Sequence, residues 1–123
     1  MKKTKSILAS ILIGLCLDTA FAATSTTNLK QYMSLAAQGN ADAQYGLGLL
    51  YFKGEGVPKN DALAVKWFRK AADQGNADAQ SFLGFLYYKG QGIPQNYATA
   101  AEWFRKAAVQ GNAEAKNFLD ELN

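Results

Sequence analysis

The sequence predicts an all-α fold built from stacked antiparallel helix pairs, a short α-solenoid. A long internal repeat carries this prediction, together with a matching set of helix signals in each copy. The hexapeptide WFRKAA occurs at Trp67–Ala72 and again at Trp103–Ala108. The longer segments Ala41–Asn76 and Ala77–Asn112 align without a gap, and about two-thirds of their positions are identical. Self-similarity at a fixed period is typical of arrays in which each unit buries its apolar face against its neighbours.

Residues 1–22 have the pattern of a secretory signal peptide. Lys2, Lys3 and Lys5 make a basic start, Ile7–Leu17 is an apolar run, and the small-any-small sequence AFA ends at Ala22. A retained membrane helix is the alternative, but the apolar run is shorter than the roughly 20 residues that span a bilayer. We therefore expect cleavage after Ala22, no membrane anchor afterwards, and a periplasmic or secreted protein.

The single cysteine, Cys16, raises the alternative of a lipid-anchored lipoprotein. Leu15 precedes it where that processing needs a small residue, and Cys16 lies inside the apolar run instead of at its end. We expect Cys16 to be removed with the signal peptide, which leaves no cysteine for disulfides.

Half-copies of the repeat flank the two full copies. NLKQYMSLAAQGN, before Ala41, matches the second half of a unit, and AEAKNFLDELN, after Asn112, matches the first half. The predicted organisation is a linker at 23–27 and one repeat domain at 28–123, divided into 28–40, 41–76, 77–112 and 113–123.

Each unit is predicted to contain two helices. The first runs from about Ala41 to Phe52, after Asn40 as N-cap, and Gly54 provides a left-handed stop. GEGVP then forms a turn, and Asn60 caps a second helix that extends to about Gln74. The second copy repeats these signals with Asn76, Gly90, Pro94, Asn96 and Gly111.

The second helix of each unit is amphipathic. At helical spacing, one side carries Ala64, Trp67, Phe68, Ala71 and Ala72, and the other carries Lys66, Arg69, Lys70 and Asp73. WFRKAA is therefore interpreted as a packing unit with both aromatic rings in the core. The alternative is that Trp67 and Trp103 stack on a ligand.

The first helix of each unit is apolar on two sides. One side is identical in both copies, whereas the other keeps its character and changes its residues. That variable side supplies the candidate partner-binding residues Tyr45, Leu49, Phe52, Ser81, Phe85 and Tyr88, with Phe52 and Phe85 as the expected anchors. The alternative is that a helix between two neighbours is apolar on both sides for packing alone. Gly48 and Gly84 predict a close approach between helices.

The pattern LGxxYxxGxGVPxN…AxxWFRKAAxxGNAxA resembles the Sel-one-like repeat family, relatives of the tetratricopeptide repeats. The resemblance covers the chain from about Asn28 onwards. It implies a right-handed superhelix and an adaptor or scaffold role in the bacterial envelope or in host contact, with no family-wide catalytic residues. Some exported members carry a cysteine pair in each repeat and resemble penicillin-binding or β-lactamase-type enzymes. An envelope enzyme of that type is the alternative function, although the cysteine pairs are missing here.

Composition argues against several other function classes. Without residues 1–22 the net charge falls from +3 to +1, which leaves no electrostatic footprint for nucleic acid or anionic lipid. The chain has no histidine, and no nucleophile motif or phosphate-binding glycine loop occurs. We therefore predict a non-catalytic module without metal or cofactor that binds a protein or peptide in the groove of the solenoid.

Overall fold

The computed structural model describes residues 29–122, and these residues form six helices and no strand. The expected signal peptide with Cys16, the linker 23–27 and the terminal positions 28 and 123 lie outside the described residues. A helix at 29–37 is followed by α2 (Ala41–Lys53), α3 (Asp61–Asp73), α4 (Ala77–Lys89), α5 (Tyr97–Val109) and α6 (Ala113–Leu122). The predicted all-α repeat fold is confirmed.

The helix ends follow the signals in the sequence. The side chains of Asn40, Asn60, Asn76 and Asn96 each accept a hydrogen bond from the backbone N–H three residues further on. These bonds satisfy donors that have no partner inside the helix. After α2, Gly54 adopts a left-handed conformation with φ of 71°. The local sequence therefore sets where each helix begins and ends.

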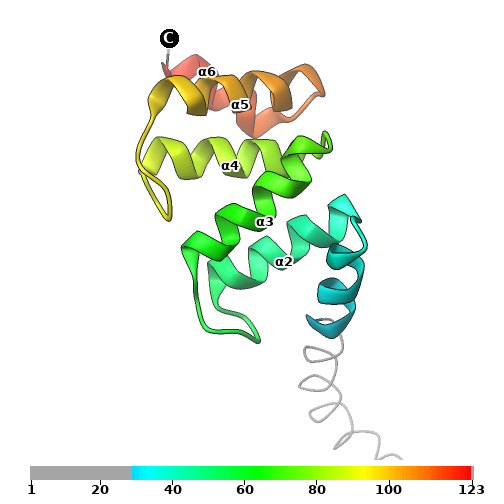
Figure 1. Cartoon of the computed structure of the whole chain (residues 1–123). Coiled ribbons are helices and arrows are strands. Elements are labelled where there is room, and N and C mark those ends of the chain that lie inside the picture. The colour runs from blue at the N-terminus through cyan, green and yellow to red at the C-terminus, as the bar shows by residue number, and fades with distance from the viewer. Residues whose placement is uncertain (1–28, 123) are drawn as a thin grey trace, which may run out of the picture.

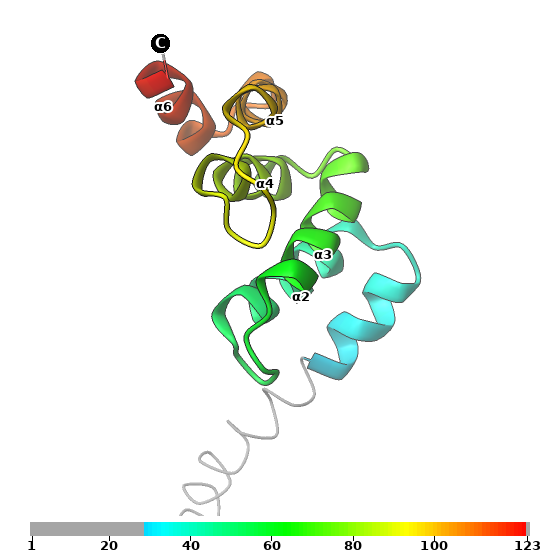
Figure 2. The same ribbon diagram turned by 60° about the vertical axis from the view of Figure 1, so that its left-hand side comes forward.

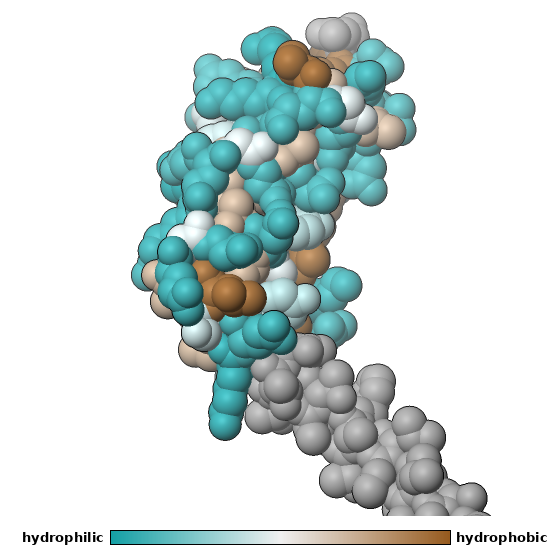
Figure 3. Space-filling view, turned by 90° about the vertical axis from the view of Figure 1, so that its right-hand side faces the viewer, coloured by the Kyte–Doolittle hydropathy of each residue, from teal (hydrophilic) through white to brown (hydrophobic). Residues whose placement is uncertain are grey.

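The helices follow one another along a curved stack, from the helix 29–37 at one end to α6 at the other (Figures 1 and 2). The extensive contacts join α2 to α3, α3 to α4, α4 to α5, and α5 to α6. The side of this stack seen in Figure 3 is mainly hydrophilic, and its hydrophobic residues lie in separate patches. Within residues 29–122, no helix combines the length and the apolar character needed to cross a membrane.

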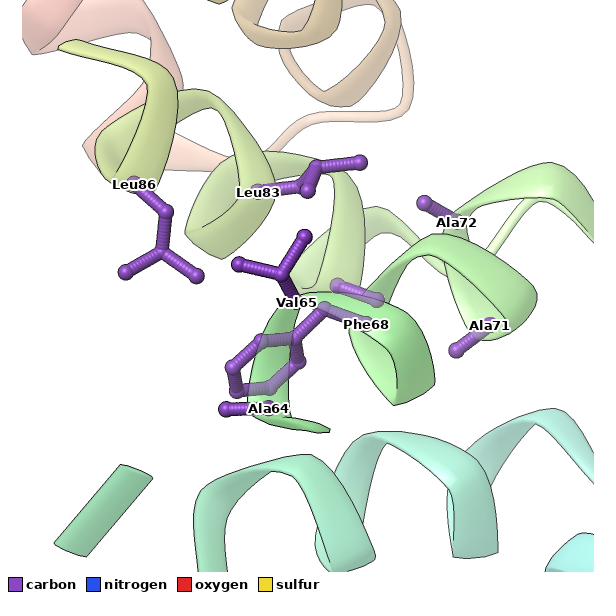
Figure 4. Packing of buried hydrophobic residues seen from close by; sticks show 8 residues of the cluster. Ala64, Val65, Phe68, Ala71, Ala72, Leu83 and Leu86 are labelled. Atoms are coloured by element: carbon purple, nitrogen blue, oxygen red, sulfur yellow. The ribbon is translucent and has the colours of Figure 1, made fainter. Parts of the chain in front are cut away.

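Phe68 of α3 connects the two helices on either side of it. Its side chain is fully buried, and it lies so close to Gly48 of α2 that a Cβ there would be 2.7 Å from the ring. The Phe68 ring also stacks on Phe82 of α4, with centroids 4.8 Å apart (Figure 4 shows the surrounding core). Gly48 is therefore required for helix contact, as predicted from its costly position inside a helix.

The next unit repeats this arrangement. Phe104 of α5 is fully buried, a Cβ on Gly84 would be 2.9 Å from its ring, and it stacks on Phe118 of α6 at 4.8 Å. At the N-terminal end, glycine takes the place of the phenylalanine on the following helix. Tyr32 occupies the position equivalent to Phe68, and its ring lies against Gly46, the position equivalent to Phe82.

The expectation that both aromatic residues of WFRKAA lie in the core is correct for only one of them. Phe68 and Phe104 are buried, but Trp67 and Trp103 are only partly buried. The ammonium groups of Lys70 and Lys106 lie 4.9 and 4.4 Å from the respective indole centroids. The tryptophans lie at the margin between the buried and the solvated side of the helix. One part of each ring packs against the core, and a lysine three residues further along the helix covers another part.

Buried glutamines join consecutive units. The Gln80 amide is buried, donates to the Ala72 carbonyl at the end of α3, and accepts from the Gln110 amide at 2.8 Å. Gln44 makes the equivalent bonds to Ala36 and Gln74 one unit earlier. Each glutamine therefore ties together the end of the preceding helix, its own helix and the end of the following helix.

The loop of the second unit packs on the start of α3. Gly92 has φ of 74°, and a Cβ there would be 2.6 Å from the Asp61 carbonyl group. The Asp61 carboxylate accepts bonds from Lys59 and from the Gln91 amide. The bond from Lys59 is the main reason why the pKa of Asp61 is lowered. Glycine is therefore needed at position 92 for two reasons: the backbone there has a positive φ, and the neighbouring unit leaves no room for a side chain.

Replacing Phe68 or Trp67 by alanine separates the two roles. We expect Phe68→Ala to lower the free energy of unfolding by about 3–5 kcal/mol, because it leaves a cavity between three helices. Trp67→Ala should cost about 1–3 kcal/mol, because its ring is only partly removed from water. Urea denaturation followed by circular dichroism measures both. Equal losses for the two variants would contradict this account of the core.

The glutamine contacts are tested by Gln80→Leu. We expect a loss of about 1–3 kcal/mol in unfolding free energy, because the Ala72 carbonyl keeps only its bond from the Gly75 backbone N–H and the Gln110 amide loses its acceptor. Gln110→Leu is the matched control, and it should cost less because the Gln110 side chain is exposed and its removal leaves the Gln80–Ala72 bond in place. A Gln80→Leu protein as stable as the parent would show that these bonds add nothing to stability.

Candidate partner-binding surface

The six predicted binding residues lie on the first helices of consecutive units. Tyr45, Leu49 and Phe52 belong to α2, and Ser81, Phe85 and Tyr88 belong to α4. Five of them are partly buried and keep some exposed surface. Ser81 differs, because only 4% of it is exposed. It can line a depression in the surface but cannot be a projecting contact residue.

Aromatic side chains link these helices into one continuous group. The Phe52 ring on α2 lies 5.0 Å from Phe82 on α4, and Phe82 lies 6.0 Å from Phe85. Phe118 on α6 is 6.0 Å from Phe85 and 6.1 Å from Tyr88. We call these five residues the aromatic strip. It extends over three helices that are separated by α3 and α5 in the sequence.

Phe82 and Phe118 are functional candidates that the sequence reasoning missed. They occupy equivalent positions, 36 residues apart, but the same position in the first copy is Gly46. The aromatic character is therefore hidden when only the two full copies are aligned. Comparing the second copy with the C-terminal half-copy would have revealed it.

A pocket opens at the C-terminal end of the strip, between α4 and α6. Its volume is about 280 Å³, and it is lined by Ser81, Phe82, Phe85, Glu114 and Phe118. This is slightly below the range of about 300–1,000 Å³ that is usual for small-molecule sites. A pocket of this size can hold one or two side chains of a partner protein.

Carboxylates form a row at the N-terminal ends of the first helices. Asp42, Asp78 and Glu114 occupy equivalent positions in successive units. The Asn76 amide donates to Asp42, and the Asn112 amide donates to Asp78. Because these two asparagines cap α4 and α6, each aspartate lies at the start of the next first helix.

Two of these carboxylates affect the pKa of Tyr45. Burial raises the pKa of its hydroxyl most, and the negative charges of Asp78 and Glu114 raise that pKa further. The bonds from Asn76 to Asp42 and from Asn112 to Asp78 connect the starts of α2, α4 and α6 along one shared surface. Along the opposite edge of the strip, where the first helices end, Lys59 lies 4.9 Å from the Phe52 centroid and Lys89 lies 5.6 Å from that of Tyr88; Lys59 also pairs with Asp61.

The opposite side of the array is chemically different. The tryptophan rings of α3 and α5 are paired with Lys70 and Lys106, and Arg69 donates a hydrogen bond to the Tyr87 hydroxyl. These aromatic groups interact with cations of their own chain, which disfavours Trp67 and Trp103 as ligand-stacking residues. Among residues 29–122, no group of three or more histidine, cysteine, aspartate or glutamate side chains could hold a metal ion.

The shared surface predicts how Tyr45 titrates. A raised pKa favours the neutral phenol in the folded protein, so Tyr45 contributes stability below the unfolded pKa of about 10, and this is lost as the pH rises through the folded pKa. Glu114→Gln should lower the pKa of Tyr45, whereas Glu102→Gln on α5 should leave it unchanged. An NMR titration of the Tyr45 ring carbons, assigned with Tyr45→Phe, measures this. An unchanged pKa in Glu114→Gln would show that the charge of Glu114 does not act on Tyr45.

Solved structures provide similar folds. A Sel1 repeat protein from Oxalobacter formigenes is 42% identical, with a TM-score of 0.74 over 75% of this chain and 27% of its own. The protective antigen c5321 of uropathogenic Escherichia coli, described as having an SLR fold, is 44% identical, with a TM-score of 0.67 over 68% of this chain and 18% of its own. Cysteine rich protein B of Helicobacter pylori is 25% identical, with a TM-score of 0.71 over 74% of this chain and 68% of its own.

Sequence comparisons agree with the structural ones. The secretory immunoglobulin A-binding protein EsiB of Escherichia coli O6:H1 is 42% identical over 66 residues, which are 54% of this chain and 14% of EsiB. This chain thus spans about a seventh of that relative. The family model of the Sel1 repeat matches residues 41–76 and 77–112, more than half of the chain. The chain therefore belongs to the Sel1 repeat family.

Proposed function

We propose that this chain is a non-catalytic interaction module that binds an extended peptide or a helix of a partner protein along the aromatic strip. Sel1 repeat proteins are typically protein–protein interaction scaffolds. The observation that carries the proposal is the strip itself, in which partly exposed rings of α2, α4 and α6 follow one another at centroid distances of 5.0–6.1 Å. Aromatic side chains are the commonest anchors of protein interfaces.

The strip is suited to binding because its rings are held in place before a partner arrives. Phe82 stacks on the buried Phe68, and Phe118 stacks on the buried Phe104. Little side-chain freedom is therefore lost when a partner covers these rings, and preorganisation of this kind favours affinity. By contrast, the Trp67 and Trp103 rings of the second helices have Lys70 and Lys106 lying over them.

The proposed location is the bacterial periplasm or the outside of the cell. The signal-like segment 1–22 supports export. The name of EsiB, a secretory immunoglobulin A-binding protein, supports a protein as the kind of partner. The alternative, an envelope enzyme of the β-lactamase or penicillin-binding type, is supported only by the resemblance to cysteine-rich relatives, and the single cysteine here is Cys16.

Binding through the strip is tested with a partner captured by photocrosslinking. A benzophenone amino acid at position 45 or 88 should crosslink a discrete protein, whereas the same group at position 66, on α3, should not. With that partner purified, Tyr45→Ala, beside the strip on α2, and Tyr88→Ala, within it, should each weaken binding by roughly 30-fold, as the loss of an aromatic anchor does. Their helical circular dichroism should match that of the parent.

Charge reversal provides the matched control. Lys66→Glu and Arg69→Glu change exposed residues of α3 on the opposite side, and they should leave affinity unchanged. If these reversals abolish binding while both tyrosine variants bind normally, the partner lies on the second helices and the strip is not the binding site. Hydrolysis of a β-lactam by the purified chain would instead support the enzyme alternative.

A further inference from the structure

The pocket between α4 and α6 has an apolar floor and an acidic rim. Phe82, Phe85 and Phe118 supply most of its surface, and Glu114 is its one charged lining residue. A smaller depression of about 120 Å³ adjoins it on α6 and is lined by Glu114, Asn117, Phe118 and Glu121. No lysine or arginine lines either cavity.

The two glutamates flank the same aromatic ring. Glu114 precedes Phe118 by four residues and Glu121 follows it by three, so all three side chains lie on one face of α6. Neither glutamate forms a salt bridge with another described residue; the ion pair found within residues 29–122 is Lys59–Asp61. Asp78 adds a third carboxylate beside the start of α6, where Asn112 holds it.

The carboxylates Asp78, Glu114 and Glu121, which form no salt bridge with a described residue, lie on this side of the strip. Lys59 and Lys89 lie over Phe52 and Tyr88 at the other ends of the first helices. Burial raises the pKa of Tyr45 most, and the charges of Asp78 and Glu114 on this side raise that pKa further. A partner that covers the pocket must bury or neutralise these carboxylates, and unpaired buried charge is costly.

We propose that this pocket selects a partner segment that carries a large apolar side chain next to an arginine or lysine. The apolar group fills the space above Phe82, Phe85 and Phe118, and the cation pairs with Glu114 and Glu121. Arginine suits the site best, because its guanidinium can bind a carboxylate in two places and stack on an aromatic ring. This inference rests on the proposed function, since it assigns the chemistry of a partner at one end of the strip.

The test uses three seven-residue peptides, blocked at both ends, with the ¹⁵N-labelled chain in NMR titrations. GSRFRSG carries both recognised features, GSEFESG reverses the charge, and GSRSRSG removes the aromatic ring. We expect GSRFRSG to shift the amide signals of Ser81, Phe85, Glu114 and Phe118, with a dissociation constant at least about tenfold lower than that of either control peptide. Higher salt should weaken its binding.

Variants of the protein identify the groups responsible. The double variant Glu114→Gln/Glu121→Gln should bind GSRFRSG no more tightly than the parent binds GSRSRSG, whereas Glu102→Gln on α5 should bind it like the parent. Phe118→Leu keeps an apolar side chain but removes the aromatic ring, and circular dichroism checks that the helices remain folded without its stacking on Phe104. It should weaken GSRFRSG more than GSRSRSG.

Each other outcome overturns the inference in a recognisable way. Equal binding of GSEFESG, or normal binding by the double glutamine variant, would show an apolar pocket without charge selection and would leave the proposed function standing. Shifts that fall on α3 and α5, or no saturable shift with any peptide up to about 5 mM, would remove the pocket as a recognition site. The proposed function is decided separately, by the binding of Tyr45→Ala and Tyr88→Ala to the captured partner.

Discussion

The array depends on the buried phenylalanine of each second helix. Phe68 and Phe104 are completely inaccessible to solvent, and each ring touches a glycine of the preceding helix and stacks on a phenylalanine of the following one. One side chain therefore sets the spacing of three helices. In a repeat protein, stability is the sum of the units and of the interfaces between neighbours. The ring packs inside its own unit and against the next unit. Replacing it therefore lowers the stability of the unit and of the interface together.

The same contacts create the candidate binding surface. Phe82 stacks on the core ring Phe68 and also lies near Phe52 and Phe85. The stack thus holds the inner edge of the strip, while the outer edge remains partly exposed. This sharing explains why the strip is continuous although α3 and α5 interrupt it in the sequence. It also means that truncating Phe82 would disturb packing and binding together, so the partly exposed Tyr45 and Tyr88 are more informative positions for mutation.

Charged side chains are arranged differently on the two sides of the molecule. The first helices begin with Asp42, Asp78 and Glu114, which suits their helix dipoles as well as a cationic partner. The second helices carry Lys70 and Lys106 over tryptophan rings. Aromatic residues therefore occur on both sides, but only those of the strip lie beside an acidic pocket. The repeat places like charges in rows, and these rows give the strip an acidic edge where the first helices begin.

The sequence by itself determined the helices, their asparagine caps, the repeat period and the need for glycine at Gly48 and Gly84. These features follow from short-range hydrogen bonding and from helical periodicity, which one unit contains in full. Only the tertiary structure decided that Phe82 and Phe118 join the strip, that Ser81 is buried and that Trp67 lies at the margin of the core. It also revealed the buried Gln44 and Gln80 contacts. These outcomes depend on how a helix crosses the next unit, and the periodicity of a single helix does not specify that crossing.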